Sequence, residues 1–277
     1  MHTTDDLIQL ALKEDIGPGD ITTDHLVAPQ TRGQGTIIAK ADLIIAGLAV
    51  AAKVFQTLDP ACLVHACGYR DGDPVAAGST VIQVDGALGA LLTGERTALN
   101  FLQRLSGIAT QTRSWVGEVA GTTVKLVDTR KTTPGWRVLE KYAVRIGGAH
   151  NHRMGLYDGV LIKDNHIAAC GGIAAAVKKV RQSISHLVKV EVETGTLEAV
   201  QEALVAGVDV IMLDNMEMDQ IRQAVRIINK RVLVEASGNV TRQQLKALAQ
   251  TGVDLISIGA LTHSALAVDL SMCIERR

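Results

Sequence analysis

A repeated alternation of short apolar strands and amphipathic helices in the C-terminal half constrains the fold of this 277-residue chain most strongly. A strand followed by a helix and a further strand needs a crossover connection, which makes neighbouring strands parallel. Six such units are fewer than the eight of a complete (β/α) barrel, so the sequence predicts an incomplete barrel or an open sheet. The expected strands lie within 123–131, 158–165, 188–194, 208–215, 231–239 and 253–264, and the expected helices within 136–148, 171–184, 197–207, 218–229 and, after a Thr241 cap, 242–252.

The first hundred residues have a different pattern. A glycine-proline loop is expected at 14–24, followed by two strand-like runs at 35–47 and 78–88. Turns separate the two runs, and a helix that packs on their sheet is expected at 48–58. This order is typical of an α+β domain with antiparallel strands. A long helix or helix pair at 91–116 should join the two parts, with the domain boundary near residue 108.

Composition excludes several classes of function. The net charge of −1 gives no overall attraction to nucleic acid or to acidic membranes, and the apolar runs are too short to span a bilayer. The N-terminus lacks the pattern of a signal peptide, and the four cysteines form no CxxC pair. We therefore expect a cytoplasmic enzyme with reduced thiols and with neither a nucleic-acid nor a membrane partner.

Charged side chains follow five of the six predicted parallel strands. Because the carboxyl ends of parallel strands hold the ligand site, this arrangement favours an active site there. Strand ends are also wet, so any single charge is as well explained by solvent, but five in succession are not. The residues at these ends are Asp128, Arg130, Lys131, Lys163, Asp164, Glu191, Glu193, Asp214 and Glu235, and the sixth strand ends in a glycine turn at Gly259.

The charges are sorted by sign along the chain. The first two units supply cations, which suit carboxylates and phosphates, and the later units supply acids, which suit Mg²⁺ bridging to phosphate oxygens. Glycine turns at 237–239 and at Gly259 could present backbone N–H groups to a phosphate. The residues alone thus predict a substrate with several carboxylates beside a metal-bound phosphorylated one. The cationic set is Arg130, Lys131, Arg153 and Lys163 with His152, and the acidic set is Glu191, Asp214 and Glu235.

Individual residues leave alternatives open. Lys163 could form a Schiff base or clamp an anion, and the cationic surroundings favour the clamp. His152 and His166 could bind a metal, but a hydrogen-bonding or structural role is favoured because no second soft ligand has ligand spacing. Arg96, at the start of the joining helix, is as consistent with a surface salt bridge as with a site. Arg137, Lys141 and Arg145 have the spacing of a solvated helix face.

Eight ordered segments resemble the quinolinate phosphoribosyltransferase family. They are EDIGPGDITTD, GERTALNFLQRLSGIAT, DTRKTTPGWRVLEKYAV, NHRMGLYDGVLIKDNH, VEVET, IMLDN, EASGN and GVDLISIGALTHS, and they cover nearly the whole chain. The resemblance implies an α/β chain, with an N-terminal α+β open sandwich at 1–107 and an incomplete six-stranded TIM-like (β/α) barrel at 108–264. Residues 265–277 would pack back on the first domain. It also implies a homodimer with shared active sites.

The resemblance further implies the reaction and the roles of individual residues. Quinolinate and 5-phosphoribosyl 1-diphosphate would react with Mg²⁺ to give nicotinate mononucleotide, pyrophosphate and CO₂. Quinolinate would contact Thr129, Arg130, His152 and Arg153, with Arg96 from the other subunit, while Lys131 and Lys163 neutralise anionic oxygens. Glu191 and Asp214 would face the ribose and the metal pyrophosphate, and Ser237, Gly238, Asn239, Gly259, Ala260 and Leu261 would hold the 5-phosphate.

Two positions depart from the family pattern, and two rival functions remain. Ala149 replaces a usual glycine, and Asn239 replaces a glycine in the phosphate turn, where asparagine tolerates a left-handed φ. A Schiff-base lyase using Lys163 would be trapped by borohydride. A non-catalytic module for a phosphorylated metabolite would release no pyrophosphate, but it has no use for the acids on the later strands.

Overall fold

The computed structural model describes residues 4–277, which divide into two compact units. The first contains 4–113, 132–148 and 261–277, and the second contains 114–131 and 149–260. The change from one to the other falls inside helix α4 (Leu88–Glu118), a single helix that also contains the boundary expected near residue 108. Residues 132–148 and 261–264, which we expected in the barrel domain, group with the first unit.

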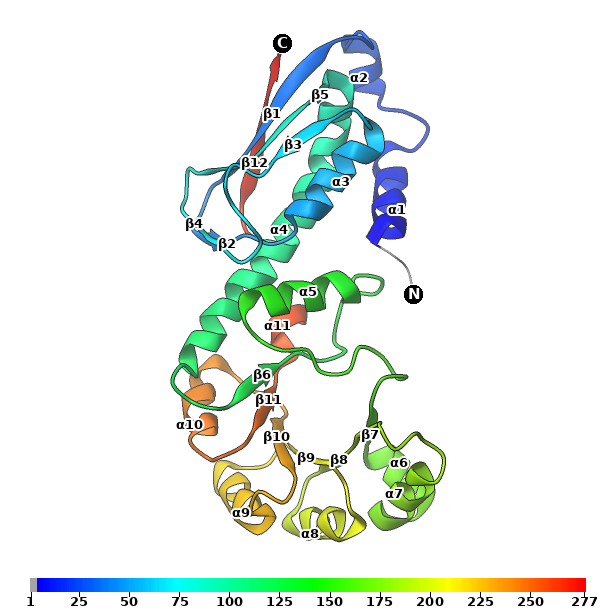
Figure 1. Cartoon of the computed structure of the whole chain (residues 1–277), viewed down its shortest axis with the longest axis vertical. Coiled ribbons are helices and arrows are strands. Elements are labelled where there is room, and N and C mark those ends of the chain that lie inside the picture. Colours follow the sequence, from blue (N-terminus) through cyan, green and yellow to red (C-terminus); the bar gives the residue numbers. More distant parts are fainter. Residues whose placement is uncertain (1–3) are drawn as a thin grey trace. The chain divides into compact units, whose positions relative to one another are not determined.

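The first unit is built on an antiparallel sheet with the order β12-β1-β5-β3 (Figure 1). The burial of β1 alternates residue by residue, as it must when one face of a strand packs on a core and the other does not. The C-terminal strand pairs with β1, placing Gly33 opposite Arg276. The strands of this unit are β1 (Arg32–Ala39), β2 (Leu43–Ile44), β3 (Leu63–His65), β4 (Pro74–Val75), β5 (Thr80–Ala87) and β12 (Leu270–Arg276).

Helices α3 and α4 pack against each other beside this sheet (Figure 1), with Phe55 of α3 close to Gly94 of α4. The helix expected at 48–58 is confirmed as α3. The loop expected at 14–24 is wrong at both ends, because α1 continues to Ile16 and the Asp20 side chain accepts a hydrogen bond from the Thr23 N–H and caps α2. The helices with residues in this unit are α1 (Thr4–Ile16), α2 (Ile21–Leu26), α3 (Leu48–Leu58), α4, α5 (Arg137–Gly147) and α11 (Ala260–His263).

Helix α5 corrects one prediction about charge. Lys141, expected on a solvated face, is completely buried, as is its neighbour Glu140. Glu140 forms an ion pair with Arg104 of α4 at 2.7 Å, so a charge on α5 is used for packing inside the unit. Helical spacing alone does not reveal which face of a helix is covered.

The second unit is a six-stranded parallel sheet with the order β6-β11-β10-β9-β8-β7, which confirms the predicted number and direction of strands. Among residues 4–277, no pairing joins the edge strands β6 and β7, so the barrel is incomplete as expected. The strands are β6 (Lys125–Val127), β7 (Val160–Ile162), β8 (Val190–Thr194), β9 (Val210–Asp214), β10 (Leu233–Ser237) and β11 (Leu255–Ser257).

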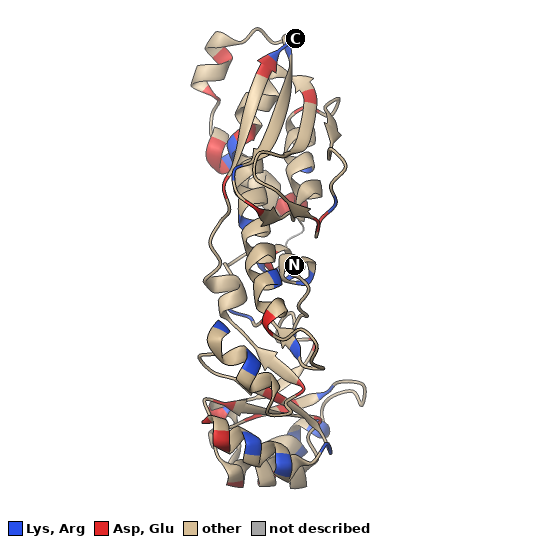
Figure 2. Cartoon of the chain, turned by 90° about the vertical axis from the view of Figure 1, so that its left-hand side faces the viewer, with Lys and Arg blue, Asp and Glu red and all other residues tan. Residues whose placement is uncertain are grey.

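Helices cover the outer side of this sheet (Figure 1), and they carry both signs of charge rather than a patch of one sign (Figure 2). The predicted cap at Thr241 is confirmed by its capping box with Gln244. The strand expected through residue 264 is wrong, because β11 ends at Ser257 and α11 begins at Ala260. The helices are α6 (Asp164–Cys170), which was not predicted, α7 (Ile173–Arg181), α8 (Leu197–Ala206), α9 (Met218–Ile228), η1 (Arg242–Gln244) and α10 (Leu245–Ala249).

A search of the described helices for one with the length and apolar character needed to cross a membrane finds none.

Candidate active site

A cavity of about 460 Å³ opens at the carboxyl ends of the parallel strands, and all of its lining residues belong to the second unit. This is the edge of the sheet where the sequence predicted a site. The lining residues are Thr129, Arg130, Lys131, His152, Arg153, Leu161, Lys163, Glu193, Met212, Asp214, Asn215, Glu235, Ser237, Gly238, Asn239 and Ser257.

Backbone pairing beside β6 explains why two cationic motifs distant in sequence meet. His150 bridges in parallel to Val127, which places the segment after His150 next to the segment after β6. The buried Asp128 carboxylate then accepts hydrogen bonds from the His152 N–H at 2.9 Å and from the Asn151 side chain at 2.6 Å. Asp128 therefore fixes the backbone from which His152 and Arg153 enter the cavity.

The guanidinium groups of Arg130 and Arg153 lie close enough for the charge of Arg130 to affect the pKa of Arg153. Burial, and then the positive charge of Arg130, lower the pKa of Arg153. Arg153 Nη1 donates a hydrogen bond to the Gly159 carbonyl at 3.0 Å, which holds its side chain at the wall. Two like charges on one cavity wall are unfavourable unless an anion lies between them, so this wall is suited to a carboxylate or phosphate.

Lys163 lies at the end of β7, where its ammonium group forms an ion pair with Glu193 of β8 at 2.7 Å. Its backbone N–H donates to His166 Nδ1 at 3.0 Å, so the His166 ring caps α6. The lysine side chain is about half exposed and ion-paired, which suits an electrostatic clamp. The cap occupies the Nδ1 atom of His166, and His166 does not line the cavity.

The turn after β10 interlocks with the residue after β9. Gly238 has a φ of +96°, and a Cβ there would lie 2.3 Å from the Asn215 side-chain oxygen. Asn239 has a φ of +47°, which confirms that asparagine can form this turn, and its side-chain amide donates to the Asn215 oxygen. Asn215 also donates to Asp214 at 2.6 Å, so the acid at the end of β9 is held in place.

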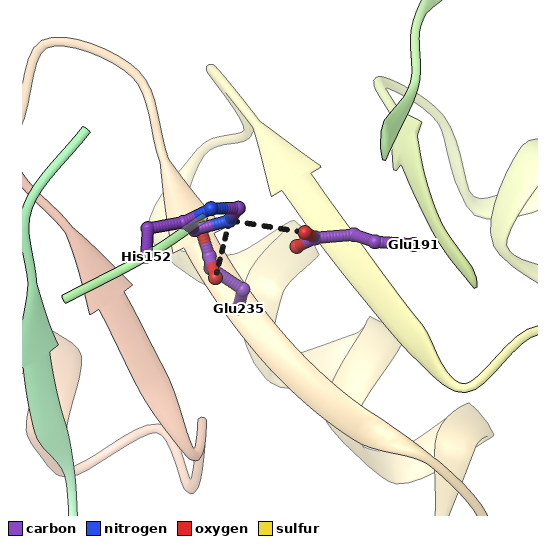
Figure 3. A group of neighbouring side chains, drawn as sticks. All are labelled: His152, Glu191 and Glu235. Carbon is purple, nitrogen blue, oxygen red and sulfur yellow. Dashed lines mark hydrogen bonds and ion pairs between the residues drawn. The ribbon is translucent and has the colours of Figure 1, made fainter. Parts of the chain in front are cut away.

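His152, in the loop before β7, contacts two buried acids, Glu191 on β8 and Glu235 on β10 (Figure 3). Its Nε2 lies 3.0 Å from a Glu191 oxygen and 3.6 Å from a Glu235 oxygen. Burial, and then the neighbouring Glu191 carboxylate, raise the pKa of Glu235 to about 7, against the opposing effect of His152. Among residues 4–277, one oxygen of each acid is buried with no hydrogen-bond partner.

Two groups of side chains could hold a metal ion: one combines a histidine with two carboxylates, and the other consists of two carboxylates. One ligand atom each from His152, Glu191 and Glu235 lie within 4.8 Å of one another. Glu193 and Asp214 instead line the cavity, at the ends of the adjacent strands β8 and β9, where water and a ligand can reach them. Carboxylate oxygens open to water and phosphate fit Mg²⁺, which keeps several of its waters.

The structure brings most of the predicted site residues together on the cavity wall. Within the described residues, Arg96, Glu191, Gly259, Ala260 and Leu261 do not line it. Arg96 is exposed on α4, Leu261 is fully buried, and Glu191 is 7% exposed beside His152. The predicted residues that do line the cavity are Thr129, Arg130, Lys131, His152, Arg153, Lys163, Asp214, Ser237, Gly238 and Asn239.

Sequence reasoning missed Asn215 as a lining residue, and it named Glu193 and Glu235 only among the charges at the strand ends. The alternation of side chains along a strand could have indicated that Glu193 lines the cavity. Glu191 and Glu193 are two residues apart and share one face of β8, but Glu193 is nearer the carboxyl end, where the cavity opens. No local pattern marks Asn215, because its role depends on the turn of a neighbouring strand.

The fold and the site define a class: a two-unit α/β protein whose parallel sheet carries, at its carboxyl edge, a cavity lined by both basic and acidic side chains. The family model for the C-terminal domain of quinolinate phosphoribosyl transferase matches residues 108–273, and the model for the N-terminal domain matches residues 20–106. The chain therefore belongs to the quinolinate phosphoribosyltransferase family.

Individual relatives agree with this assignment. The chain is 50% identical over 275 residues to the probable carboxylating nicotinate-nucleotide pyrophosphorylase of Synechocystis, covering 98% of this chain and 92% of that protein. It is 48% identical over 261 residues to the protein of the same name from Bacillus subtilis, covering 94% and 89%. The crystal structure of NadC from Streptococcus pyogenes superposes with a TM-score of 0.95 at 41% identity, covering 99% and 96%.

Proposed function

We propose that this chain transfers the phosphoribosyl group of 5-phosphoribosyl 1-diphosphate to quinolinate with loss of CO₂, in de novo NAD biosynthesis. The products are nicotinate mononucleotide and pyrophosphate. The observation that carries the proposal is the cavity itself, whose lining brings Arg130, Lys131 and Arg153 together with Glu193 and Asp214. Family membership then identifies which two anionic substrates such a cavity serves.

The cationic side would bind quinolinate. Its two carboxylates match the paired guanidinium groups of Arg130 and Arg153, since a guanidinium can donate two parallel hydrogen bonds to a carboxylate. Lys131 and Lys163 would neutralise further anionic oxygens, and Thr129 and His152 would complete the wall. In a pocket that excludes water, this compensation is needed before two anions can approach each other.

The acidic side would bind the phosphoribosyl donor. We assign Mg²⁺ to Asp214 with Glu193, in place of the Glu191 expected from sequence, because Glu193 lines the cavity and Glu191 is buried. When bound, the ion would neutralise the pyrophosphate leaving group. Backbone N–H groups of 237–239 would hold the 5-phosphate, as the family resemblance implies, whereas residues 259–261, which the resemblance also names, do not line the cavity.

The reaction needs no protein nucleophile. The quinolinate nitrogen forms a bond to the ribose C1 as the bond from C1 to pyrophosphate breaks. The C2 carboxylate then leaves as CO₂, and its bonding electron pair stays on C2 beside the cationic ring nitrogen until C2 takes up a proton. The side chains contribute by orienting the two substrates and by matching charge that develops at the ribose and at the pyrophosphate.

We further propose a homodimer in which Arg96 completes the cavity of the partner subunit. Its exposed side chain on α4, which is not part of the cavity lining of its own chain, supports this arrangement. A cytoplasmic location is supported by the four cysteines, Cys62, Cys67, Cys170 and Cys273, which are all free thiols.

The direct test is quinolinate-dependent release of pyrophosphate, measured with and without Mg²⁺. We expect release only when both substrates and the ion are present. Arg130→Ala should abolish quinolinate binding with the fold intact, whereas the matched control Arg226→Ala, exposed on α9, should bind normally. Normal turnover by Arg130→Ala would refute the assignment, and borohydride trapping of a carbonyl substrate on Lys163 would favour a Schiff-base lyase.

A further inference from the structure

The contacts of the His152 ring determine which of its nitrogens carries the proton. The Arg153 backbone N–H donates a hydrogen bond to His152 Nδ1 at 2.7 Å, so Nδ1 must present a lone pair. In a neutral imidazole the proton then lies on Nε2. Nε2 is the atom that faces both acids, so Glu191 accepts its hydrogen bond at 3.0 Å and Glu235 lies within ion-pair distance at 3.6 Å (Figure 3).

The burial of these acids shows that they do more than stabilise the fold. Glu191 is 7% exposed and Glu235 is 1% exposed, and in each the Oε1 atom is buried without a hydrogen-bond partner among residues 4–277. Buried carboxylates with unmet oxygens are unfavourable, and an apolar side chain in either position would usually stabilise the unit more. The two carboxyl groups also lie beside each other, and Ser257 lies beside Glu235, but the His152 ring is a group that both acids face, which points to the ring as a reason for the arrangement.

A metal ion bound to the same three side chains would need a different ring. Their ligand atoms lie within 4.8 Å of one another, which is close enough for one cation. A metal on Nε2 requires the lone pair there, which moves the proton of the neutral ring to Nδ1. Two N–H donors, from Nδ1 and from the Arg153 backbone, would then face each other across 2.7 Å. The observed geometry therefore favours a proton on Nε2 over a cation.

The His152 ring is also part of the cavity surface that would contact the substrate. His152 and Arg153 both line the cavity, and the same hydrogen bond joins the ring of one to the backbone of the other. Asp128 holds the His152 N–H and the Gly159 carbonyl holds the Arg153 guanidinium. The orientation of the ring is the remaining freedom in this segment, and the two acids remove it.

We propose that Glu191 and Glu235 are positioning residues, which hold His152 as its Nε2–H tautomer and thereby hold Arg153 against a carboxylate of the substrate. The statement about the substrate rests on the proposed function. The statement about the ring does not, so the two can be tested separately.

The ring assignment is tested by ¹⁵N NMR of the full chain with labelled histidines, near neutral pH and without substrate. The His152 signals are identified by their loss in His152→Gln. We expect a pyridine-like Nδ1 and a protonated, pyrrole-like Nε2. A protonated Nδ1 with a pyridine-like Nε2 would overturn the proposal whether or not the chain turns over quinolinate.

The effect on the substrate is tested with Glu235→Met and Glu235→Gln, since glutamine keeps a polar oxygen that can face Nε2–H at the same distance. We expect Glu235→Met to raise KM for quinolinate roughly tenfold and to leave KM for 5-phosphoribosyl 1-diphosphate unchanged. Glu235→Gln should recover most of this loss. Asp254→Asn is the control, because Asp254 accepts the Val234 N–H at the amino end of β11 and should leave both KM values unchanged.

Two kinetic or binding results would also overturn the proposal. The first is a wild-type KM for quinolinate in a folded Glu235→Met, or an equal rise of both KM values. The second is one Mn²⁺ bound per wild-type chain that is lost in Glu235→Met but kept in Asp214→Asn. If the wild-type chain releases no pyrophosphate with quinolinate, the proposed function fails, and the NMR result still decides the ring assignment.

Discussion

Gly238 gives the sharpest test of the phosphate turn, and Gly238→Ala is the perturbation. An added Cβ would lie 2.3 Å from the Asn215 side-chain oxygen and 2.7 Å from the Asn215 backbone nitrogen. The first atom can rotate away, but the second belongs to a backbone held by its hydrogen bond to the Ser237 carbonyl. The φ of +96° is also one that an L side chain rarely adopts.

Strain of this kind costs about 1–3 kcal/mol for the backbone, and overpacking costs a similar amount, so we expect a total of about 2–6 kcal/mol. If the turn keeps its shape, the cost appears as a lower free energy of unfolding. If the turn relaxes, it appears as weaker binding of the donor, and about 2 kcal/mol corresponds to roughly a 30-fold rise in KM for 5-phosphoribosyl 1-diphosphate.

Urea denaturation and donor KM should be measured on the same preparation. The matched control is Gly117→Ala, in helix α4 with no atom within 4 Å of the added Cβ, where alanine should be neutral or stabilising. Adding Asn215→Ala to Gly238→Ala should restore only part of the loss, because the backbone contact remains. A Gly238→Ala protein with unchanged stability and unchanged donor KM would refute the reasoning.

Three further predictions concern charge. Arg104→Met should lower the free energy of unfolding by about 3–5 kcal/mol, because the fully buried Glu140 loses its cation. In chemical denaturation, adding Glu140→Gln should recover part of this loss, and additive losses from the two substitutions would contradict the prediction. Glu235 binds its proton more tightly in the folded chain, where its pKa is about 7 against an ordinary 4.5. The contribution of this tighter proton binding to the free energy of unfolding is therefore complete below pH 4.5 and is lost as the pH rises through 7. The stability of Glu235→Gln relative to wild type should therefore rise between pH 4.5 and 7, by on the order of 3 kcal/mol at most, and a pH-independent difference in urea unfolding would contradict this. Chelation of Mg²⁺ should stop pyrophosphate release, and Asp214→Asn should raise the Mg²⁺ concentration needed for half-maximal rate; an unchanged requirement would exclude Asp214 from the metal site.

Local chemistry made much of the fold predictable. Parallel strands follow from the strand and helix periods, and capping follows from residues such as Thr241, whose side chain satisfies helix N–H groups close in sequence. The place of the site was predictable for a related reason, since the carboxyl ends of parallel strands always share one edge. The helix α6 was missed because its cap uses His166, which is not among the usual capping residues.

The sequence by itself determined the six parallel units, the antiparallel domain before them, the concentration of cations near Arg130 and Arg153, and the resemblance to a family. These depend on residues within a few positions of one another, or on motifs in order. Only the tertiary structure decided that Glu193 rather than Glu191 lines the cavity, that Lys141 is buried, and that Glu235 meets His152. Burial and contact across strands depend on which faces the whole chain covers, and the pattern of a single strand or helix does not contain that information.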